Sequence, residues 1–147
     1  MPAPTTTPVR ATGLAADLRV AVLRTSRRLR AEKSDADLSD AQFSVLAYLA
    51  KEGATTPGVL AEHEHVQPPS MTRTINALVA AGYLTRAPGA VDRRQVLVDL
   101  SDAGRDVVRE TRRRRDAWLT RRLAQLSPDE RETLARAADI LRRLTTT

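Results

Sequence analysis

Apolar residues recur every three or four positions through most of the chain, and this spacing predicts helices. Residues with known preferences for helix ends bound these segments: Ser or Thr before the first turn, proline within it and glycine after the last. The predicted helices are, in chain order, residues 14–31; a segment that follows the S-x-x-Q capping box at 39–42 and ends at Gly53; a short one from Thr56-Pro57 to about His65; 67–82; 102–125; and a last one after a second capping box at 127–130.

The period changes after Gly82, where apolar and polar residues begin to alternate. Residues 83–86 and 95–100 are rich in strand formers, and the Pro88-Gly89 pair between them is a turn signal. This pattern predicts a β-hairpin. The expected fold class is therefore mainly α with a small β-hairpin.

The two ends of the chain differ in character. Residues 1–12 are rich in proline and threonine and are expected to form a disordered tail, which leaves 13–147 as one domain. The first and last helices carry apolar stripes that the central segment is too distant in sequence to cover fully. We therefore expect a homodimer held by stripes on these arms, which contain Leu14, Leu18, Val22 and Leu29 in the first helix and Leu134, Leu141 and Leu144 in the last.

Charge indicates the class of partner. The formal net charge is +6, the sequence pI is about 10.9, and Lys33 and Lys51 are the only lysines among 24 basic residues. Arginine's planar fork suits phosphate, so a polyanion is the expected partner. There is no cysteine, which excludes disulfides and thiolate metal sites. No apolar run approaches the ~20 residues of a membrane span, so we expect a soluble cytoplasmic protein with no membrane partner.

The stretch 67–82 is the strongest candidate for a binding element. Its apolar residues form one helical face, while Ser70, Arg73, Asn76 and Ala77 form a small polar face opposite. Short side chains let a helix approach base-pair edges, and arginine and asparagine supply hydrogen bonds to them. Alone, this pattern is more typical of an ordinary surface helix. The order short helix, turn, helix, hairpin favours a winged helix-turn-helix, with the second helix in the major groove.

Residues 38–100 resemble the MarR family of bacterial transcriptional regulators, most clearly in PGVLAEHEHVQPPSMTRTINALVAAGYLTR and DRRQVLVDLSDAG. The resemblance extends over about 14–144 and implies a homodimer whose first and last helices interlock, with dimerisation helices over about 13–33 and 102–145. It also implies binding to a double-stranded, pseudo-palindromic operator. It makes Arg94 the wing arginine of the minor groove, oriented by Asp92, for which Arg73 is our candidate partner. The double proline at 68–69 departs from the family pattern and affects where the recognition helix begins and which base contacts it makes. The predicted DNA-binding residues are Pro69, Ser70, Thr72, Arg73, Asn76, Asp92, Arg93 and Arg94.

The resemblance also implies a small aromatic or phenolic effector in a cleft formed by the first, second and fifth helices. Phe43 and Tyr48 are candidate ligand-binding residues, although a phenylalanine at helical spacing, as Phe43 is, is more often plain core. His63 and His65 lie two residues apart, on different faces of a helix, so we expect no metal site there. No catalytic or nucleotide-binding motif is found, and no enzymatic activity or cofactor is expected.

The expected function is that of a transcriptional regulator, and the resemblance implies a repressor. Two alternatives remain open from the sequence. The first is a sequence-tolerant nucleoid-type DNA binder, in which the arginine excess would dominate affinity. The second is a winged-helix module that binds another protein rather than nucleic acid.

Overall fold

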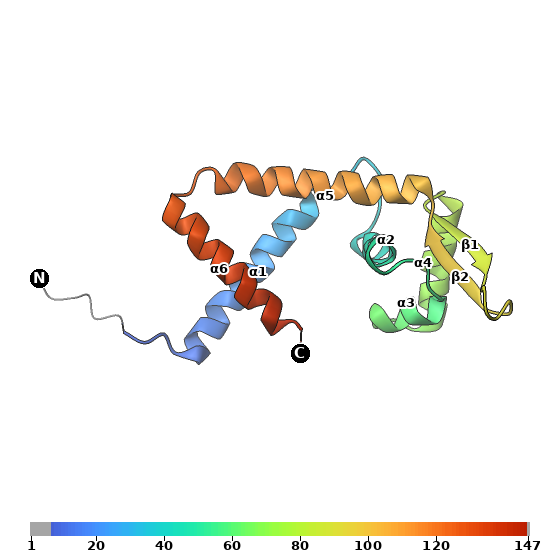
Figure 1. Cartoon of the computed structure of the whole chain (residues 1–147), viewed down its shortest axis with the longest axis horizontal. Coiled ribbons are helices and arrows are strands. Elements are labelled where there is room, and N and C mark those ends of the chain that lie inside the picture. Colours follow the sequence, from blue (N-terminus) through green and yellow to red (C-terminus); the bar gives the residue numbers. More distant parts are fainter. Residues whose placement is uncertain (1–6, 147) are drawn as a thin grey trace, which may run out of the picture. The chain divides into compact units, whose positions relative to one another are not determined.

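The structure is a computed structural model that describes residues 7–146. Figure 1 shows the elements of this part of the chain, whose contacts divide it into two units at Glu32, each described by itself. In chain order the elements are α1 (Ala11–Ala31), α2 (Asp40–Glu52), α3 (Pro57–His63), α4 (Pro68–Ala80), β1 (Leu84–Pro88), β2 (Val96–Leu100), α5 (Asp102–Leu123) and α6 (Pro128–Leu144). The predicted class, mainly α with a two-stranded hairpin, is confirmed.

The first unit contains α1 alone. This helix begins at Ala11, three residues before the predicted start, although its N-cap residue Arg10 forms no side-chain cap. The expected tail is therefore shorter than predicted at its inner end, while its residues 1–6 lie outside the described residues. No residue of α1 is buried, and the exposed apolar side chains are those of Leu14, Val20, Val22 and Leu23.

The second unit has its core where α2, α3, α4, the hairpin and the start of α5 meet. The most completely buried side chains come from α2, α3, α4 and β2, and include Leu46, Leu60, Met71, Ile75, Leu78 and Val98, while α5 adds the buried Val108. Local signals start α2 and α3 as expected. Ser39 and Gln42 form a reciprocal capping box, and Thr56 caps α3 ahead of Pro57.

Helices α3 and α4 end with the same backbone motif. At the end of α4, Gly82 has φ 84°, and the Tyr83 and Gly82 amides donate to the carbonyls of Leu78 and Val79. At the end of α3, His65 takes the glycine's place with φ 54°, and the Val66 and His65 amides make the equivalent bonds. This is the Schellman arrangement, which usually requires glycine. It turns the chain sharply between α3 and α4.

The strands β1 and β2 pair antiparallel, with Leu84 opposite Leu100 and Arg86 opposite Val98. Thr55 adds a short bridge to Val98 on the other edge of β2. The start of α5 is fixed to this sheet by Ser101, whose hydroxyl donates to the Gly82 carbonyl and accepts from the Gly104 amide. The hairpin, α4 and α5 therefore meet at one rigid corner.

Helix α5 ends two residues before its predicted end, and the capping box Ser127–Glu130 starts α6 as predicted. No residue of α6 is buried, and its exposed apolar side chains are those of Leu134, Ile140, Leu141 and Leu144. Within residues 7–146, no helix combines the length and the apolar content that crossing a bilayer requires.

Candidate nucleic-acid interface

The polar face of α4 is exposed, as the sequence predicts. Pro69, Thr72, Arg73 and Asn76 are exposed and Ser70 is half-buried, while Met71, Ile75 and Leu78 on the opposite face are buried. The hydroxyl of Thr72 donates to the carbonyl of Pro68 at 3.0 Å. It can therefore accept a hydrogen bond from a ligand but cannot donate one.

The double proline places the start of α4 at Pro68. Neither proline has an amide hydrogen, and the next amide, that of Ser70, donates to the Gln67 carbonyl at 3.0 Å. A helix N-terminus often binds phosphate through free amides. This one presents none in its first three positions, so contacts from α4 must come from side chains.

The tip of the hairpin is a compact loop organised by Asp92. Its carboxylate accepts the Arg94 amide at 3.0 Å, and its carbonyl accepts the Gln95 amide at 3.1 Å. The Gly89 amide closes the loop by donating to the Gln95 carbonyl at 2.8 Å. A Cβ on Gly89 would lie 2.5 Å from the Asp92 carbonyl oxygen, which explains the glycine. The tip is therefore preorganised by its backbone.

The predicted pairing of Asp92 with Arg73 is not formed. Within the described part of the chain, no ion pair involves Asp92, which instead holds the backbone of Arg94. Asp92 therefore bonds to a main-chain amide of the hairpin tip rather than to a guanidinium. A carboxylate two residues before an amide forms this bond locally, and that local bond competes with any distant partner.

Arg86 was missed by sequence reasoning. Its guanidinium donates to the Oδ1 atom of Asn76, which links β1 to the exposed face of α4. The alternation of β1 was the available signal, because Arg86 shares a strand face with the buried Leu84. That face is directed toward α4.

Charge is distributed unevenly over the second unit. Residues 66–98 contain four arginines and a single carboxylate, that of Asp92, which gives this segment a net charge of +3. Among the described residues, Arg73, Arg86, Arg93 and Arg94 take part in no ion pair. Several α5 arginines, in contrast, are neutralised by carboxylates. Two hydrogen bonds from Arg113, then one from Arg114, lower the pKa of Glu110 to about 2.

The two residues predicted to bind a ligand have different neighbours. The guanidinium carbon of Arg115 lies 4.7 Å from the centre of the Phe43 ring, and the space beside that ring is only about 10 Å³. A volume of this size holds at most about one water molecule. Tyr48 instead packs against His63 with the two rings tilted by 53° and their centres 4.4 Å apart. Of the cavities described here, the small one beside Phe43 is the one that either residue lines, so ligand binding by this pair stays a prediction.

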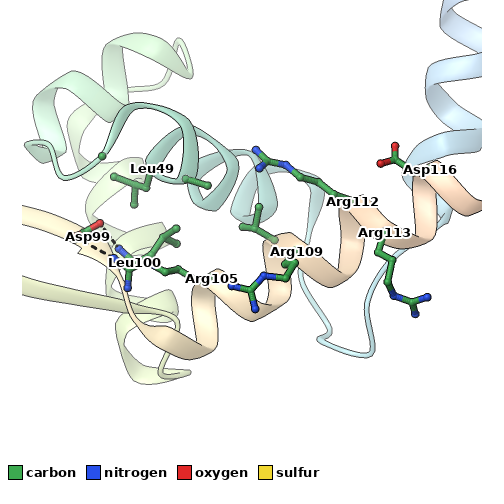
Figure 2. A pocket seen from close by; sticks show the side chains of 11 residues that line it. Leu49, Asp99, Leu100, Arg105, Arg109, Arg112, Arg113 and Asp116 are labelled. Carbon is green, nitrogen blue, oxygen red and sulfur yellow. Dashed lines mark hydrogen bonds and ion pairs between the residues drawn. The ribbon is translucent and has the colours of Figure 1, made fainter.

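A larger groove of about 650 Å³ lies between the end of α2 and the first half of α5. Figure 2 shows its apolar floor, formed in part by Leu49 and Leu100, and the arginines along α5. Arg105 is held by Asp99 at 3.6 Å, whereas Arg112 extends over the groove and takes part in no ion pair within residues 7–146. No sequence pattern indicates this groove, because its lining comes from three separate elements, α2, β2 and α5.

The Glu62–His65 segment has a structural role. Glu64 is 17% exposed at its side chain, accepts the Ser44 hydroxyl at 2.6 Å and lies 3.2 Å from Nδ1 of His63. His65 lies in the turn described above. Within residues 7–146, no three His, Cys, Asp or Glu side chains are placed to hold a metal ion.

Comparisons with known proteins agree with this architecture. A model of the MarR family matches residues 36–95. The chain is 49% identical over 128 residues to an uncharacterised HTH-type transcriptional regulator of Mycobacterium bovis, covering 87% of this chain and 90% of that protein. It is 31% identical over 102 residues to the multiple antibiotic resistance protein MarR of Salmonella typhimurium, covering 69% and 71%.

Two solved structures share the fold. The crystal structure of RV1404 from Mycobacterium tuberculosis matches with a TM-score of 0.82 at 29% identity, covering 98% of this chain and all of that one. A MepR mutant from S. aureus, bound to an oligodeoxyribonucleotide, matches with a TM-score of 0.67 at 20% identity, covering 90% and 98%. The chain therefore belongs to the MarR family of DNA-binding, winged helix-turn-helix transcriptional regulators.

Proposed function

We propose that this regulator is a repressor that binds a pseudo-palindromic operator as a homodimer. The observation that carries the proposal is the arginine set of α4 and the wing. Arg73, Arg93 and Arg94 lie on or beside the recognition elements, and no carboxylate neutralises them among the described residues. Unneutralised guanidinium groups attract phosphate and release condensed counterions on binding.

The proposed DNA-binding residues divide into those of α4, which face the major groove, and those of the wing. Ser70, Thr72 and Arg73 would meet base edges in the major groove, with the exposed Pro69 against the groove wall and Asn76 one turn further along α4. Arg94 would enter a flanking minor groove, where the negative potential is concentrated. Asp92 fixes the backbone of Arg94, and Arg93 is available to the phosphates. Occupancy of the operator would then block transcription.

The dimer proposal rests on α1 and α6. Each helix has no buried residue and several exposed large apolar side chains. Exposed apolar stripes of this length favour an obligate interface, which buries more than ~2,000 Å². Light scattering at micromolar concentration should give twice the monomer mass. A monomeric mass would contradict the proposal.

The groove between α2 and α5 supports an effector of a definite class. Leu49, Leu100 and Val108 provide an apolar surface for a flat ring, and Arg112 provides a cation for a carboxylate. We therefore propose a small aromatic acid as the effector that releases DNA. Benzoate and hydroxybenzoates should weaken operator binding by wild type, and Arg112→Gln should remove that response while leaving operator affinity in the absence of the acid unchanged.

In the decisive experiment, genomic DNA fragments that bind the purified protein are selected and sequenced. A regulator should recover a few fragments that share an inverted repeat, and should prefer them to random DNA by ~10³-fold or more. Recovery of fragments without a shared motif would favour a nucleoid-type binder. Absence of binding even at low salt would contradict the DNA-binding function itself.

A further inference from the structure

The wing carries a groove of its own, which runs from β1 to the hairpin tip. The groove has a volume of about 260 Å³ and lies on the hairpin beyond the core. Its floor is apolar and its two cationic side chains come from different parts of the hairpin. The lining residues are Arg86, Ala87, Pro88, Arg93, Gln95 and Val96.

Strand register explains how these residues meet. Pro88 pairs with Val96 and Arg86 with Val98, so Arg86 and Pro88 lie on the strand face that includes the buried Leu84. Toward the tip, this face leaves the core, and Val96 is 44% exposed. The apolar side chains of this face, those of Pro88 and Val96, are therefore directed toward the recognition helix, but no described residue covers them.

Arg86 is fixed at the inner end of this groove. Its guanidinium donates to Oδ1 of Asn76, a neutral amide, so the bond orients the cation without cancelling its charge. Arg93 provides the second cation from the tip, whose backbone is held by Asp92. No ion pair reaches either arginine from the part of the chain that the structure describes. The charges on both remain available.

We propose that this wing groove binds one sugar–phosphate segment of the operator. Arg86 and Arg93 bind phosphate oxygens, and Pro88 and Val96 pack against the deoxyribose between them. Asn76 is then a positioning residue that aims Arg86, rather than a reader of bases. This inference rests on the operator binding proposed above, and it changes the role that the sequence suggested for Asn76.

A phosphate contact and a base contact give different signatures. Each phosphate neutralised contributes about 0.9 to the slope of log affinity against log salt, whatever the sequence. A base contact leaves the salt slope nearly unchanged and alters preference at one base pair. The two arginines and Asn76 can therefore be assigned by measuring salt dependence and sequence preference together.

The experiment titrates the selected operator with full-length protein by fluorescence anisotropy at four salt concentrations. Arg86→Gln and Arg93→Gln should each reduce the slope by about 1 per subunit, with an equal loss of affinity on every single-base operator variant. Arg86→Lys keeps the charge and should retain the slope. Lys51→Gln removes an exposed charge at the end of α2 and serves as the control, with slope and affinity unchanged.

Asn76→Ala should weaken binding by roughly 3- to 10-fold with the slope and the base preferences retained. In an Arg86→Gln background it should have no further effect. An unchanged slope in Arg86→Gln, with a wild-type melting temperature, would overturn the phosphate contact. Relaxed preference at one base pair in Asn76→Ala would make Asn76 a base reader and overturn its positioning role. If wild type binds no DNA, the proposed operator function fails, and the inference with it.

Discussion

Gly104 tests the corner where α5 joins the recognition helix and the wing. A Cβ on this glycine would lie 2.2 Å from the Tyr83 carbonyl oxygen and 3.1 Å from Cδ2 of Leu100. The obstacle is backbone rather than the far end of a flexible side chain. The same carbonyl accepts the Ser101 amide at 3.1 Å, so the two segments cannot separate without losing a hydrogen bond.

The size of the effect follows from two opposing contributions. Relief of the clash needs a backbone shift of roughly 1 Å, and overpacking of this kind costs about 1–3 kcal/mol. Replacing glycine with alanine inside a helix gains about 0.5–1 kcal/mol. Gly104→Ala should therefore lower the free energy of unfolding by about 1–2 kcal/mol. With a urea m-value of about 2 kcal/mol/M, the midpoint should fall by about 0.5–1 M.

The assay is urea denaturation followed by circular dichroism, at one fixed protein concentration because dimerisation contributes to stability. Gly58→Ala is the matched control. It lies in α3 and is exposed, and an added Cβ would meet Oγ1 of Thr56 at an ordinary 3.9 Å. The urea midpoint of Gly58→Ala should equal or exceed that of wild type. A Gly104→Ala midpoint at or above that of wild type would refute the close approach of α5 to Tyr83.

Three further predictions concern the wing, an ion pair and a turn. Arg94→Ala should weaken binding to all related operators by a similar factor and flatten the salt slope by about one unit per half-site, measured by anisotropy; an unchanged slope would contradict the minor-groove assignment. Arg113, then Arg114, lowers the pKa of Glu110 from 4.5 to about 2, so its carboxylate stabilises the fold above pH 4.5 and loses this contribution as the pH falls toward 2. Glu110→Gln should therefore lower the urea midpoint at pH 7, by little because the group is solvent-screened, and the gap should close near pH 2. His65→Gly should raise the urea midpoint by the equivalent of about 1 kcal/mol, because the φ of 54° favours glycine.

Most of the fold could be predicted because its boundaries are set locally. The Ser39–Gln42 box, Thr56-Pro57 and the box at 127–130 each satisfy amides within one turn, so the sequence alone identifies them. The turn after α3 was harder to predict from the sequence. A histidine takes the left-handed position there, and no local rule prefers His65 to its neighbours, although the helix end was predicted within two residues.

The candidate site was predictable in its residue types but not in its pairings. Asp92 was expected to reach a guanidinium across space, whereas an amide two residues away offers the same carboxylate a bond at lower entropic cost. Asn76 was read as a free side chain because helical periodicity shows only that it is exposed. Its partner, Arg86, comes from a strand, and only the register of the hairpin places the two together.

The double proline at 68–69 determines which groups of α4 can contact DNA. It keeps α4 helical from Pro68 but leaves no free amide in the first three positions of the helix. Phosphate binding by backbone amides at this end is thereby excluded, and no basic residue occurs between 66 and 72 to replace them. The cations nearest the recognition face are then Arg73 on α4 and the three arginines of the hairpin. Electrostatic attraction to DNA in this lobe therefore depends mainly on the wing, which makes a rigid, glycine-closed hairpin a requirement for affinity.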